Sequence, residues 1–426
     1  MDFPSSLELS DLEKLSLNLE RAAVFNTYAA IELKSNLSQS ILQKALGLLQ
    51  QKHYYLNVCI KESRFLYQAN QAIPILLNDI TSREEAINLI REEMAKKFDL
   101  TKAPLLKILL FQEGNNVQYL AVVISHIISD GPSNFRLLNS LLEFCDTTRE
   151  FNKLPAINFC EQYFPEVSGY KAKEILTATK VTYNKIDTDQ KYTQSIKLSL
   201  SEEQTLILRK KCKEKQVTIY SALTAGGILA VYNKYLKNVG DIDHCNIMER
   251  LTLDMRQYCK GNIAKEQLGF WSLLQSNIRR VSRDENFWDL AVRIQTDLDN
   301  TVKNRWFVAD MQKLKTTLKQ YESGVPNFNS FDNSLVAIMN NFGNMDSVFS
   351  SDFKNFKIIS LLDEAILLSA NYTKTNYMLF CILTTFNKKM NLIFYYQPMS
   401  ISKSDYNVLI KDFINILNEN LLLNFH

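Results

Sequence analysis

The sequence predicts a mixed α/β (α+β) protein made of two lobes, and three observations support this. The chain has 426 residues, which at about 100–200 residues per domain suits two or three units. Hydrophobic residues make up 46% and charged residues 22%, as in a globular protein with a sizeable core. Helix-like and strand-like segments occur on both sides of a Tyr-rich connection at residues 152–191. We therefore expect an N-terminal lobe at residues 1–165 and a C-terminal lobe at residues 166–426.

The N-terminal half mixes helical and strand periodicities. An amphipathic helix is predicted over residues 37–51, with Ser38 as its N-cap. Its apolar face consists of Ile41, Leu42, Ala45, Leu46 and Leu49. Two short strands with a turn near residues 61–63 follow, and then a helix over residues 82–98. Residues 104–128 predict a hairpin whose second strand is apolar on both faces, as a strand in mid-sheet would be. A further helix begins at Ser133.

The C-terminal half repeats this mixture. Helices are predicted over residues 201–215, 217–236, 285–304 and 402–423. Ser201 and Gln204 fit a capping box at the start of the first of them. Strands are predicted over residues 192–200, 246–256, 269–281 and 334–345, and a hairpin over residues 378–398.

Composition excludes several classes of protein. A net charge of +3 gives no electrostatic footprint for nucleic acid, and the basic run at residues 209–215 reads as a solvated helix face. Seven Cys without a Cys-x-x-Cys pair argue against a disulfide framework or a structural zinc site. The remaining histidines, His53, His244 and His426, are dispersed, so we expect no metal centre, and His53 is expected to cap or pack near a helix end. No signal peptide or membrane span is apparent, and we expect a soluble, cytoplasmic protein.

The stretch "AVVISHIISDGPSN" at residues 121–134 places His126 in an apolar strand that breaks at Asp130 and Gly131. One interpretation is a packed histidine with one satisfied hydrogen bond. The other is a general base at a cleft, because a neutral imidazole with a pKa near ~6.5 accepts protons at physiological pH. A strand followed by a turn does not give a serine-protease triad, and no Gly-x-Ser-x-Gly occurs. If the histidine is catalytic, direct base catalysis suits it better than a covalent mechanism.

"SHIISDGPS" resembles the His-x-x-x-Asp-Gly motif of the superfamily with the chloramphenicol-acetyltransferase-like fold. That group includes nonribosomal-peptide condensation domains, polyketide-associated acyltransferases, alcohol acetyltransferases and plant BAHD acyltransferases. The resemblance continues in order along the chain, through "ALGLLQQKHYYLNVCI", "FDLTKAPLLKILLF", "LTLDMRQYC", "LGFWSLLQSN" and "IMNNFGNMD". It implies two chloramphenicol-acetyltransferase-like lobes that form a V with a central tunnel.

The resemblance also assigns roles to residues. His126 would lie in the tunnel and take the proton of the acceptor, and Asp130 would pair with Arg256 in a structural role. Gly131 would permit the tight turn that follows. The candidate tunnel-lining residues are Ser125, Trp271, Asn341 and Gly343, with Trp306 as a further candidate.

Three departures from the family pattern separate the branches. Ser125 replaces the first of two consecutive histidines usual in condensation domains, and Asn57 stands where an arginine is expected. Residues 341–345 read Asn-Phe-Gly-Asn-Met, in place of the plant signature Asp-Phe-Gly-Trp-Gly. The altered plant signature weakens the plant-type interpretation and favours the alcohol-acetyltransferase or polyketide-associated branch.

The resemblance implies an acyltransferase that moves an acyl group from a thioester donor to a hydroxyl or amine acceptor. The donor would be an acyl-CoA or an acyl group on the phosphopantetheine arm of a carrier protein, with no tightly bound cofactor. The expected partners are a small-molecule acceptor and an acyl or peptidyl carrier protein. The alternative is a catalytically inactive docking or scaffold member of the same fold. A third alternative is a carnitine- or lipoyl-type acyltransferase of the same fold, but this sequence has no match to the longer motifs of those enzymes.

Overall fold

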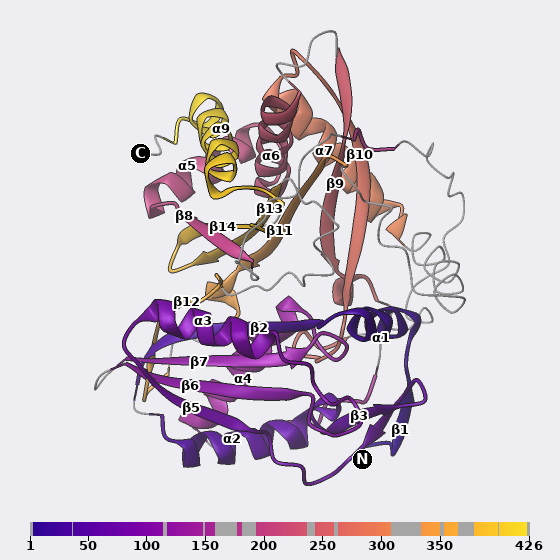
Figure 1. Cartoon of the computed structure of the whole chain (residues 1–426), viewed down its shortest axis with the longest axis vertical. Coiled ribbons are helices and arrows are strands. Elements are labelled where there is room, and N and C mark those ends of the chain that lie inside the picture. Colours follow the sequence, from indigo (N-terminus) through magenta and orange to yellow (C-terminus); the bar gives the residue numbers. More distant parts are fainter. Residues whose placement is uncertain are drawn as a thin grey trace.

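The computed structural model describes residues 3–35, 37–113, 117–147, 150–157, 177–180, 193–236, 243–259, 263–307, 334–349, 353–364, 379–398 and 400–423. Figure 1 shows two lobes, one below the other, each with its own large sheet and covering helices. The mixed α/β class predicted from the sequence is therefore confirmed. The proposed boundary between residues 165 and 166 lies outside the described residues.

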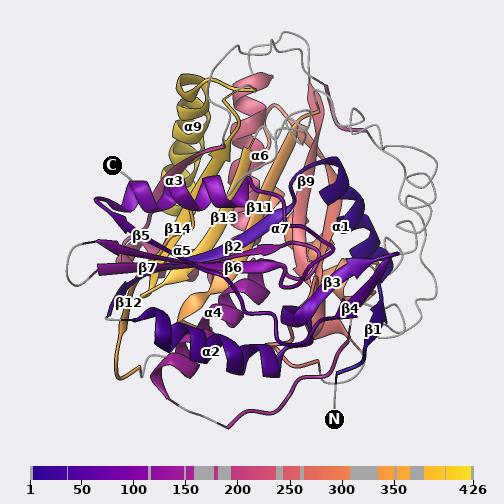
Figure 2. The same ribbon diagram turned by 60° about the horizontal axis from the view of Figure 1, so that its bottom comes forward.

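The N-terminal lobe is built on a five-stranded sheet with the strand order β12-β2-β7-β6-β5. These strands are β12 (Lys357–Leu361), β2 (Asn26–Lys34), β7 (Val117–Ser125), β6 (Leu106–Glu113) and β5 (Ile75–Ile80). Its helices are α2 (Gln39–Lys52), α3 (Arg83–Met94) and α4 (Gly131–Asp146). Figure 2 shows α3 on one face of this sheet and α2 and α4 on the other. The middle strand β7 is buried on both faces, as its apolar sequence predicts.

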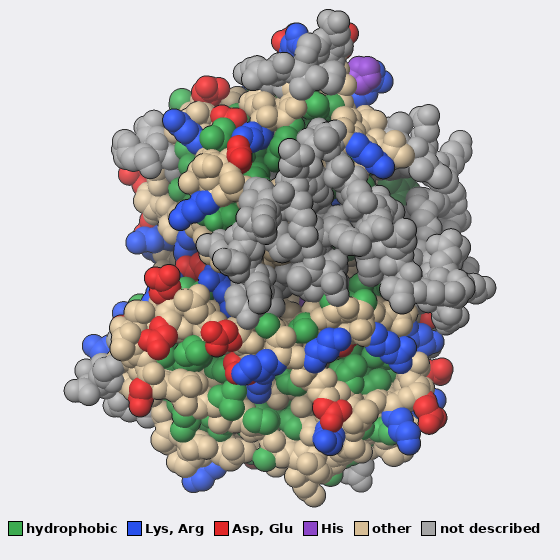
Figure 3. Space-filling model, in the orientation of Figure 1, with side chains coloured by type: hydrophobic (Ala, Val, Ile, Leu, Met, Phe, Trp, Pro, Cys, Tyr) green, Lys and Arg blue, Asp and Glu red, His purple; other side chains and the backbone are tan. Residues whose placement is uncertain are grey.

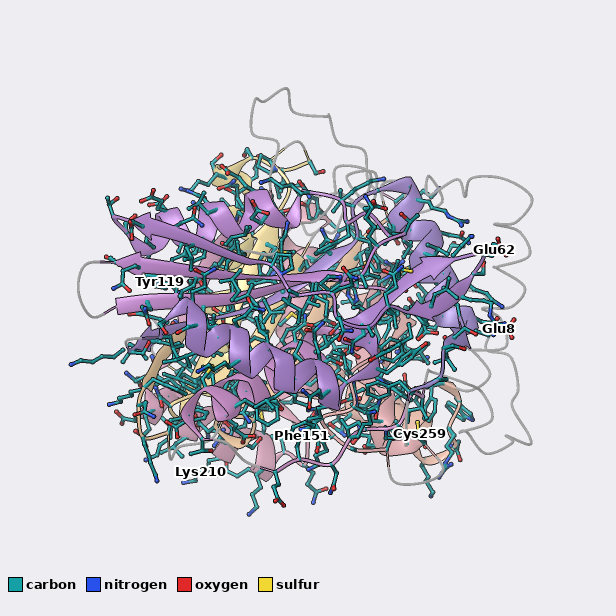
Figure 4. All side chains as sticks on the ribbon, turned by 90° about the horizontal axis from the view of Figure 1, so that it is seen from below. Glu8, Glu62, Tyr119, Phe151, Lys210 and Cys259 are labelled. Atoms are coloured by element: carbon teal, nitrogen blue, oxygen red, sulfur yellow. The ribbon has the colours of Figure 1, made fainter. Side chains whose placement is uncertain are left out.

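A small sheet completes this lobe. It has the order β1-β4-β3 and consists of β1 (Ser6–Glu8), β4 (Arg64–Tyr67) and β3 (Val58–Lys61). The predicted turn between β3 and β4 contains Glu62 and Ser63, both with positive φ. Figure 4 shows Glu8 and Glu62 on one side of the molecule and Tyr119 of β7 toward the other. Helix α1 (Asp11–Ala22) connects β1 to β2, and the short helix η1 (Tyr54–Asn57) precedes β3.

The C-terminal lobe has a six-stranded sheet in the order β10-β9-β11-β13-β14-β8. Its strands are β10 (Ser272–Ser282), β9 (His244–Asp254), β11 (Val336–Asn344), β13 (Leu379–Phe386), β14 (Lys389–Tyr396) and β8 (Gln194–Ser199). Its helices are α5 (Glu202–Glu214), α6 (Ile219–Tyr235), α7 (Phe287–Lys303) and α9 (Lys403–Leu421). Helix α6 packs on the sheet between α7 and α9, which explains why its sequence is apolar nearly all round.

Several local predictions hold and others fail. Ser38 caps α2, and Ser201 and Gln204 form the predicted capping box. Ile41 is 39% exposed, so its place on the buried face of α2 was wrong. The sequence pattern also missed α1, β1, β2, β5 and β12.

Strand β12 belongs to the sheet of the other lobe. It follows β11 of the C-terminal lobe in the chain, yet it pairs antiparallel with β2. This segment, far beyond residue 165 in the chain, is therefore part of the sheet built from the N-terminal strands. The physical reason is that β2 has a free edge, and β12 supplies the backbone donors and acceptors that this edge needs.

Asp363 and Glu364, which follow β12 and Leu362 in the chain, connect the two lobes. Glu364 forms ion pairs with Arg83 of α3 (2.9 Å) and Lys197 of β8 (3.4 Å). Asp363 binds Lys197 (3.0 Å) and accepts a hydrogen bond from Thr384 of β13 (2.9 Å). Figure 1 shows α3 on the side of its sheet that faces the C-terminal lobe. This lobe-bridging cluster is therefore a direct electrostatic contact between the lobes.

Candidate active site

His126 lies at the end of β7, where the strand turns into α4. Its amide donates a hydrogen bond to the carbonyl of Phe25 (2.9 Å), which continues the pairing of β7 with β2 by one step. The next turn is closed by the amide of Ile128, which donates to the carbonyl of Ser125 (3.2 Å). The histidine backbone is thus held by the sheet on one side and by a tight turn on the other.

The imidazole of His126 has a defined tautomer. Its Nδ1 lies 2.7 Å from the carbonyl oxygen of Ser129. A carbonyl only accepts hydrogen bonds, so the neutral ring carries its proton on Nδ1 and keeps a lone pair on Nε2. Burial lowers the pKa of His126 below its ordinary value, against the opposing charge of Asp130. At neutral pH the ring is therefore uncharged, and Nε2 has no partner among the described residues.

Two aromatic rings from different lobes enclose the imidazole. Phe25, just before β2, stacks on it with a centroid distance of 4.5 Å and an interplanar angle of 12°. Phe270, just before β10, meets it edge-on at 4.8 Å. All three side chains are partly exposed. His126 therefore lies where the two lobes meet, and part of its ring is accessible.

Asp130 faces inward and does not touch His126 in any described hydrogen bond. As the N-cap of α4, its carboxylate accepts hydrogen bonds from the amide (2.9 Å) and the hydroxyl (2.6 Å) of Ser133. The other oxygen accepts from the amide of Trp271 (2.9 Å) and the hydroxyl of Ser272 (2.9 Å). Asp130 has no exposed surface. The carboxylate is saturated with donors, so it anchors the turn and has no capacity to act on a substrate.

Arg256 supplies the charge that balances Asp130. It follows β9, and its guanidinium lies 3.3 Å from Asp130 and 2.9 Å from Asp254. It also donates to the carbonyl oxygen of Gln267 (3.1 Å). Burial alone would raise the pKa of Asp130, but the Arg256 charge and the Ser133 hydrogen bonds hold it below its ordinary value. The structure thus brings Asp130 and Arg256 together as a buried contact between the lobes.

Gly131 is needed for a close approach between the lobes. A Cβ atom at this position would lie 2.7 Å from the Cζ of Phe342 in β11. The ring of Phe342 therefore rests directly on the first residue of α4. Gly343 follows with a φ of +83°, a conformation that favours glycine, and its amide donates to the Asn341 side chain (2.8 Å).

The candidate tunnel-lining residues fall into two groups. Ser125 and Trp271 are fully buried, so they have no exposed surface to offer a tunnel. The Trp271 ring packs in the C-terminal core and under Arg256. Asn341 is exposed and Gly343 is partly exposed. Trp306 follows α7 and is partly exposed.

Residues that the sequence left unnoticed also shape the site. Phe25, Phe270, Phe342, Ser133 and Ser272 make the contacts described above. Phe270 and Ser272 flank Trp271, and Phe342 lies in "IMNNFGNMD", so the resemblance covers the segments of all three without assigning them a role. No sequence pattern indicated Phe25. Asn57, which replaces an expected arginine, is buried and donates to the carbonyls of Gln50 (2.8 Å) and His53 (3.1 Å), so it stabilises a local turn.

Neither a metal-ligand cluster nor a membrane-spanning helix occurs among the described residues. No three His, Cys, Asp or Glu side chains gather there as metal ligands would. His53 is the buried C-terminal cap residue of α2, and burial lowers its pKa to about 3. In the part of the chain that the structure describes, no helix is both long and apolar enough to cross a bilayer. Figure 3 shows acidic and basic side chains interspersed over the visible described surface of both lobes.

Solved structures share this fold over nearly the whole chain. The condensation domain of the monacolin K polyketide synthase MokA aligns with a TM-score of 0.69 at 12% identity, over 99% of this chain and 98% of that one. The epimerization domain from the third module of tyrocidine synthetase B gives 0.71 at 13%, over 99% and 98%. Trichothecene 15-O-acetyltransferase from Fusarium sporotrichioides gives 0.70 at 11%, over 99% and 95%. The fold expected from the resemblance is thereby confirmed.

Sequence comparison gives the family. Nonribosomal peptide synthetase kk1B of Curvularia clavata is 28% identical over 138 residues, which are 31% of this chain and 1% of that protein. Cyclosporin synthetase simA of Tolypocladium inflatum is 28% identical over 124 residues, which are 28% of this chain and 1% of that protein. The chain thus spans a small fraction of the curated relatives it matches. The family described as "Condensation domain" matches residues 14–422, and this chain therefore belongs to the condensation-domain family.

Proposed function

We propose that this chain transfers an acyl group from a thioester to a hydroxyl or amine, with Nε2 of His126 as the general base. The observation that carries the proposal is the hydrogen bond between Nδ1 and the carbonyl of Ser129. It fixes the tautomer in which Nε2 accepts a proton, and burial keeps the ring neutral at pH 7.

In the proposed reaction, His126 alone carries the proton from the acceptor to the leaving thiolate. The acceptor O–H or N–H attacks the thioester carbonyl carbon while Nε2 takes its proton. The tetrahedral intermediate then expels the thiolate, which receives the proton back from the imidazolium. The products are an ester or amide and a free thiol, and the ring returns to its neutral form.

The residues around the base would keep it in place. Asp130 and Arg256 anchor the start of α4 without contacting the reacting atoms. Phe25 and Phe270 flank the imidazole and reduce the water around it. Their rings come from different lobes, so the base depends on how the lobes are joined.

The donor is proposed to be an acyl-CoA or an acyl group on a carrier protein's phosphopantetheine arm. Membership in the condensation-domain family supports a thioester donor, and a nonribosomal peptide synthetase is among the matched curated relatives. A small-molecule acceptor and a carrier protein are the proposed partners.

The test is transfer activity in His126→Gln with a panel of acyl-CoAs and acyl-loaded carrier proteins. A working general base contributes about 10²–10⁴ in rate, so kcat is expected to fall by that factor. His244→Gln is the matched control, since His244 is exposed on β9 and lies against Arg280. Wild-type activity in His126→Gln would refute the base. A chain that binds carrier protein equally well with and without His126, and transfers nothing, would be a docking module instead.

A further inference from the structure

Glu20 is a buried carboxyl near the active site that the proposed chemistry does not use. It lies in the last turn of α1 and is only 2% exposed. Its Oε2 accepts a hydrogen bond from the amide of Phe25. Its Oε1 is buried and has no hydrogen-bond partner in the described part of the chain. A buried carboxyl with one unpaired oxygen destabilises the folded state. A purely structural role therefore does not explain why Glu20 lies here.

Phe25 links this carboxyl to the proposed base. Its amide donates to Glu20, its carbonyl accepts from the amide of His126 (2.9 Å), and its ring stacks on the imidazole. The next residue in the chain, Asn26, is also fixed, because its side-chain amide donates a hydrogen bond to the carbonyl of Met94 (2.9 Å). Glu20 is therefore the side chain that holds Phe25 from the α1 side, and Phe25 contacts both the backbone and the ring of His126.

We propose that Glu20 is a positioning residue for His126: its carboxyl holds Phe25 in place, and Phe25 in turn orients the imidazole and shields one of its faces. The inference rests on the proposed function for the role of His126, but the coupling itself is a property of the fold. It also gives the unused carboxyl a reason to be buried.

The coupling has a pH dependence. Burial raises the pKa of Glu20 to about 7, although the amide of Phe25 and the charge of Lys97 act in the opposite direction. Lys97 faces this end of α1 from the segment after α3, and its Nζ donates to the carbonyls of Glu20 (3.2 Å) and Arg21 (3.4 Å). Asp130 is the charged group that acts on His126, and its charge raises the pKa of the ring. A change in the charge of Glu20 near neutral pH should therefore be felt at the imidazole.

The test is a pH titration of the histidine ring signals by NMR, with ¹³C at Cε1. The chain has four histidines, and His126→Gln assigns the signal of interest. In the wild type, the His126 signal should show its own titration and a second inflection near pH 7 from Glu20. Glu20→Gln should remove the second inflection and keep the first, because an amide oxygen still accepts from Phe25. Glu20→Leu should move the pKa of His126 up toward its ordinary value and lower kcat about tenfold, with KM little changed.

Two further variants separate positioning from general stability. Glu13→Gln alters another buried carboxyl of α1, which accepts from the amide of Ser10 (2.8 Å) and from Tyr55 (3.1 Å), and it should leave the His126 titration unchanged. Phe25→Leu should raise the pKa of His126 as Glu20→Leu does, and it serves if Glu20→Leu does not fold. Superimposable His126 titrations in the wild type, Glu20→Gln and Phe25→Leu would overturn the inference. Coupled titrations in a chain that transfers no acyl group would support positioning and refute only the proposed function.

Discussion

Arg256→Met tests the buried contact between the lobes. Asp130 is completely buried, and Arg256 is 6% exposed. Removing the guanidinium leaves a buried carboxylate without its compensating charge, which typically costs about 3–5 kcal/mol. Four donors remain on Asp130, namely the amide and hydroxyl of Ser133, the amide of Trp271 and the hydroxyl of Ser272. They offset part of the loss, so we expect a destabilisation of about 3 kcal/mol at pH 7.

The pH dependence of this loss distinguishes a lost charge from lost packing. In the wild type the pKa of Asp130 lies below its ordinary value, so its contribution to stability is present above about pH 4 and is lost as the pH falls further. Without Arg256 that pKa rises, and the carboxyl can take a proton under mild acid. The difference in unfolding free energy between wild type and Arg256→Met should therefore shrink from pH 7 to pH 5.

Urea denaturation followed by tryptophan fluorescence at both pH values measures the difference. Arg136→Met is the matched control, because Arg136 pairs only with Asp254, at 3.3 Å, in the described salt bridges, and both of these side chains are partly exposed. Its loss should cost less than about 1 kcal/mol. The reasoning is refuted if Arg256→Met unfolds within 1 kcal/mol of the wild type at pH 7. A loss of equal size at pH 5 and pH 7 would show that packing, and not charge, dominates.

Two further substitutions test the contacts between the lobes. Gly131→Ala would place a Cβ 2.7 Å from the ring of Phe342, so we expect a loss of about 1–3 kcal/mol in urea denaturation. The double variant Gly131→Ala/Phe342→Leu should recover most of it, and strictly additive losses would contradict the steric explanation. Glu364→Gln should cost about 1–2 kcal/mol at pH 7, because Arg83 and Lys197 lose a charged partner. These cations hold the pKa of Glu364 below its ordinary value despite burial, so the loss should begin to shrink below about pH 4 and vanish only when the pH falls below this lowered pKa. A loss that stays constant through the acid range would argue against the explanation.

Local signals in the sequence predicted most elements of the fold. The N-cap residues Ser38 and Ser201 identify the helices that follow them, because a side-chain oxygen at that position satisfies a free backbone amide. The apolar run of β7 predicts a strand buried on both faces. The missed strand β12 has no such signal, since its position depends on the free edge of β2 and not on its own periodicity.

The candidate site divides in the same way. The sequence by itself placed His126 in an apolar strand that breaks at Asp130 and Gly131, because strand and turn patterns are local. It started the next helix at Ser133, whereas the structure begins α4 at Gly131 with Asp130 as the N-cap. Only the tertiary structure decided which groups surround them. Phe25, Phe270 and Arg256 come from segments far apart in the chain. Phe25 reaches this turn through the pairing of β2 with β7 inside the N-terminal lobe, whereas Phe270 and Arg256 reach it through the packing of the C-terminal lobe on that sheet. The periodicity of side chains reports only on the strand, helix or turn in which they lie. The groups around His126 are set by close packing between segments distant in the chain, which no short sequence pattern predicts.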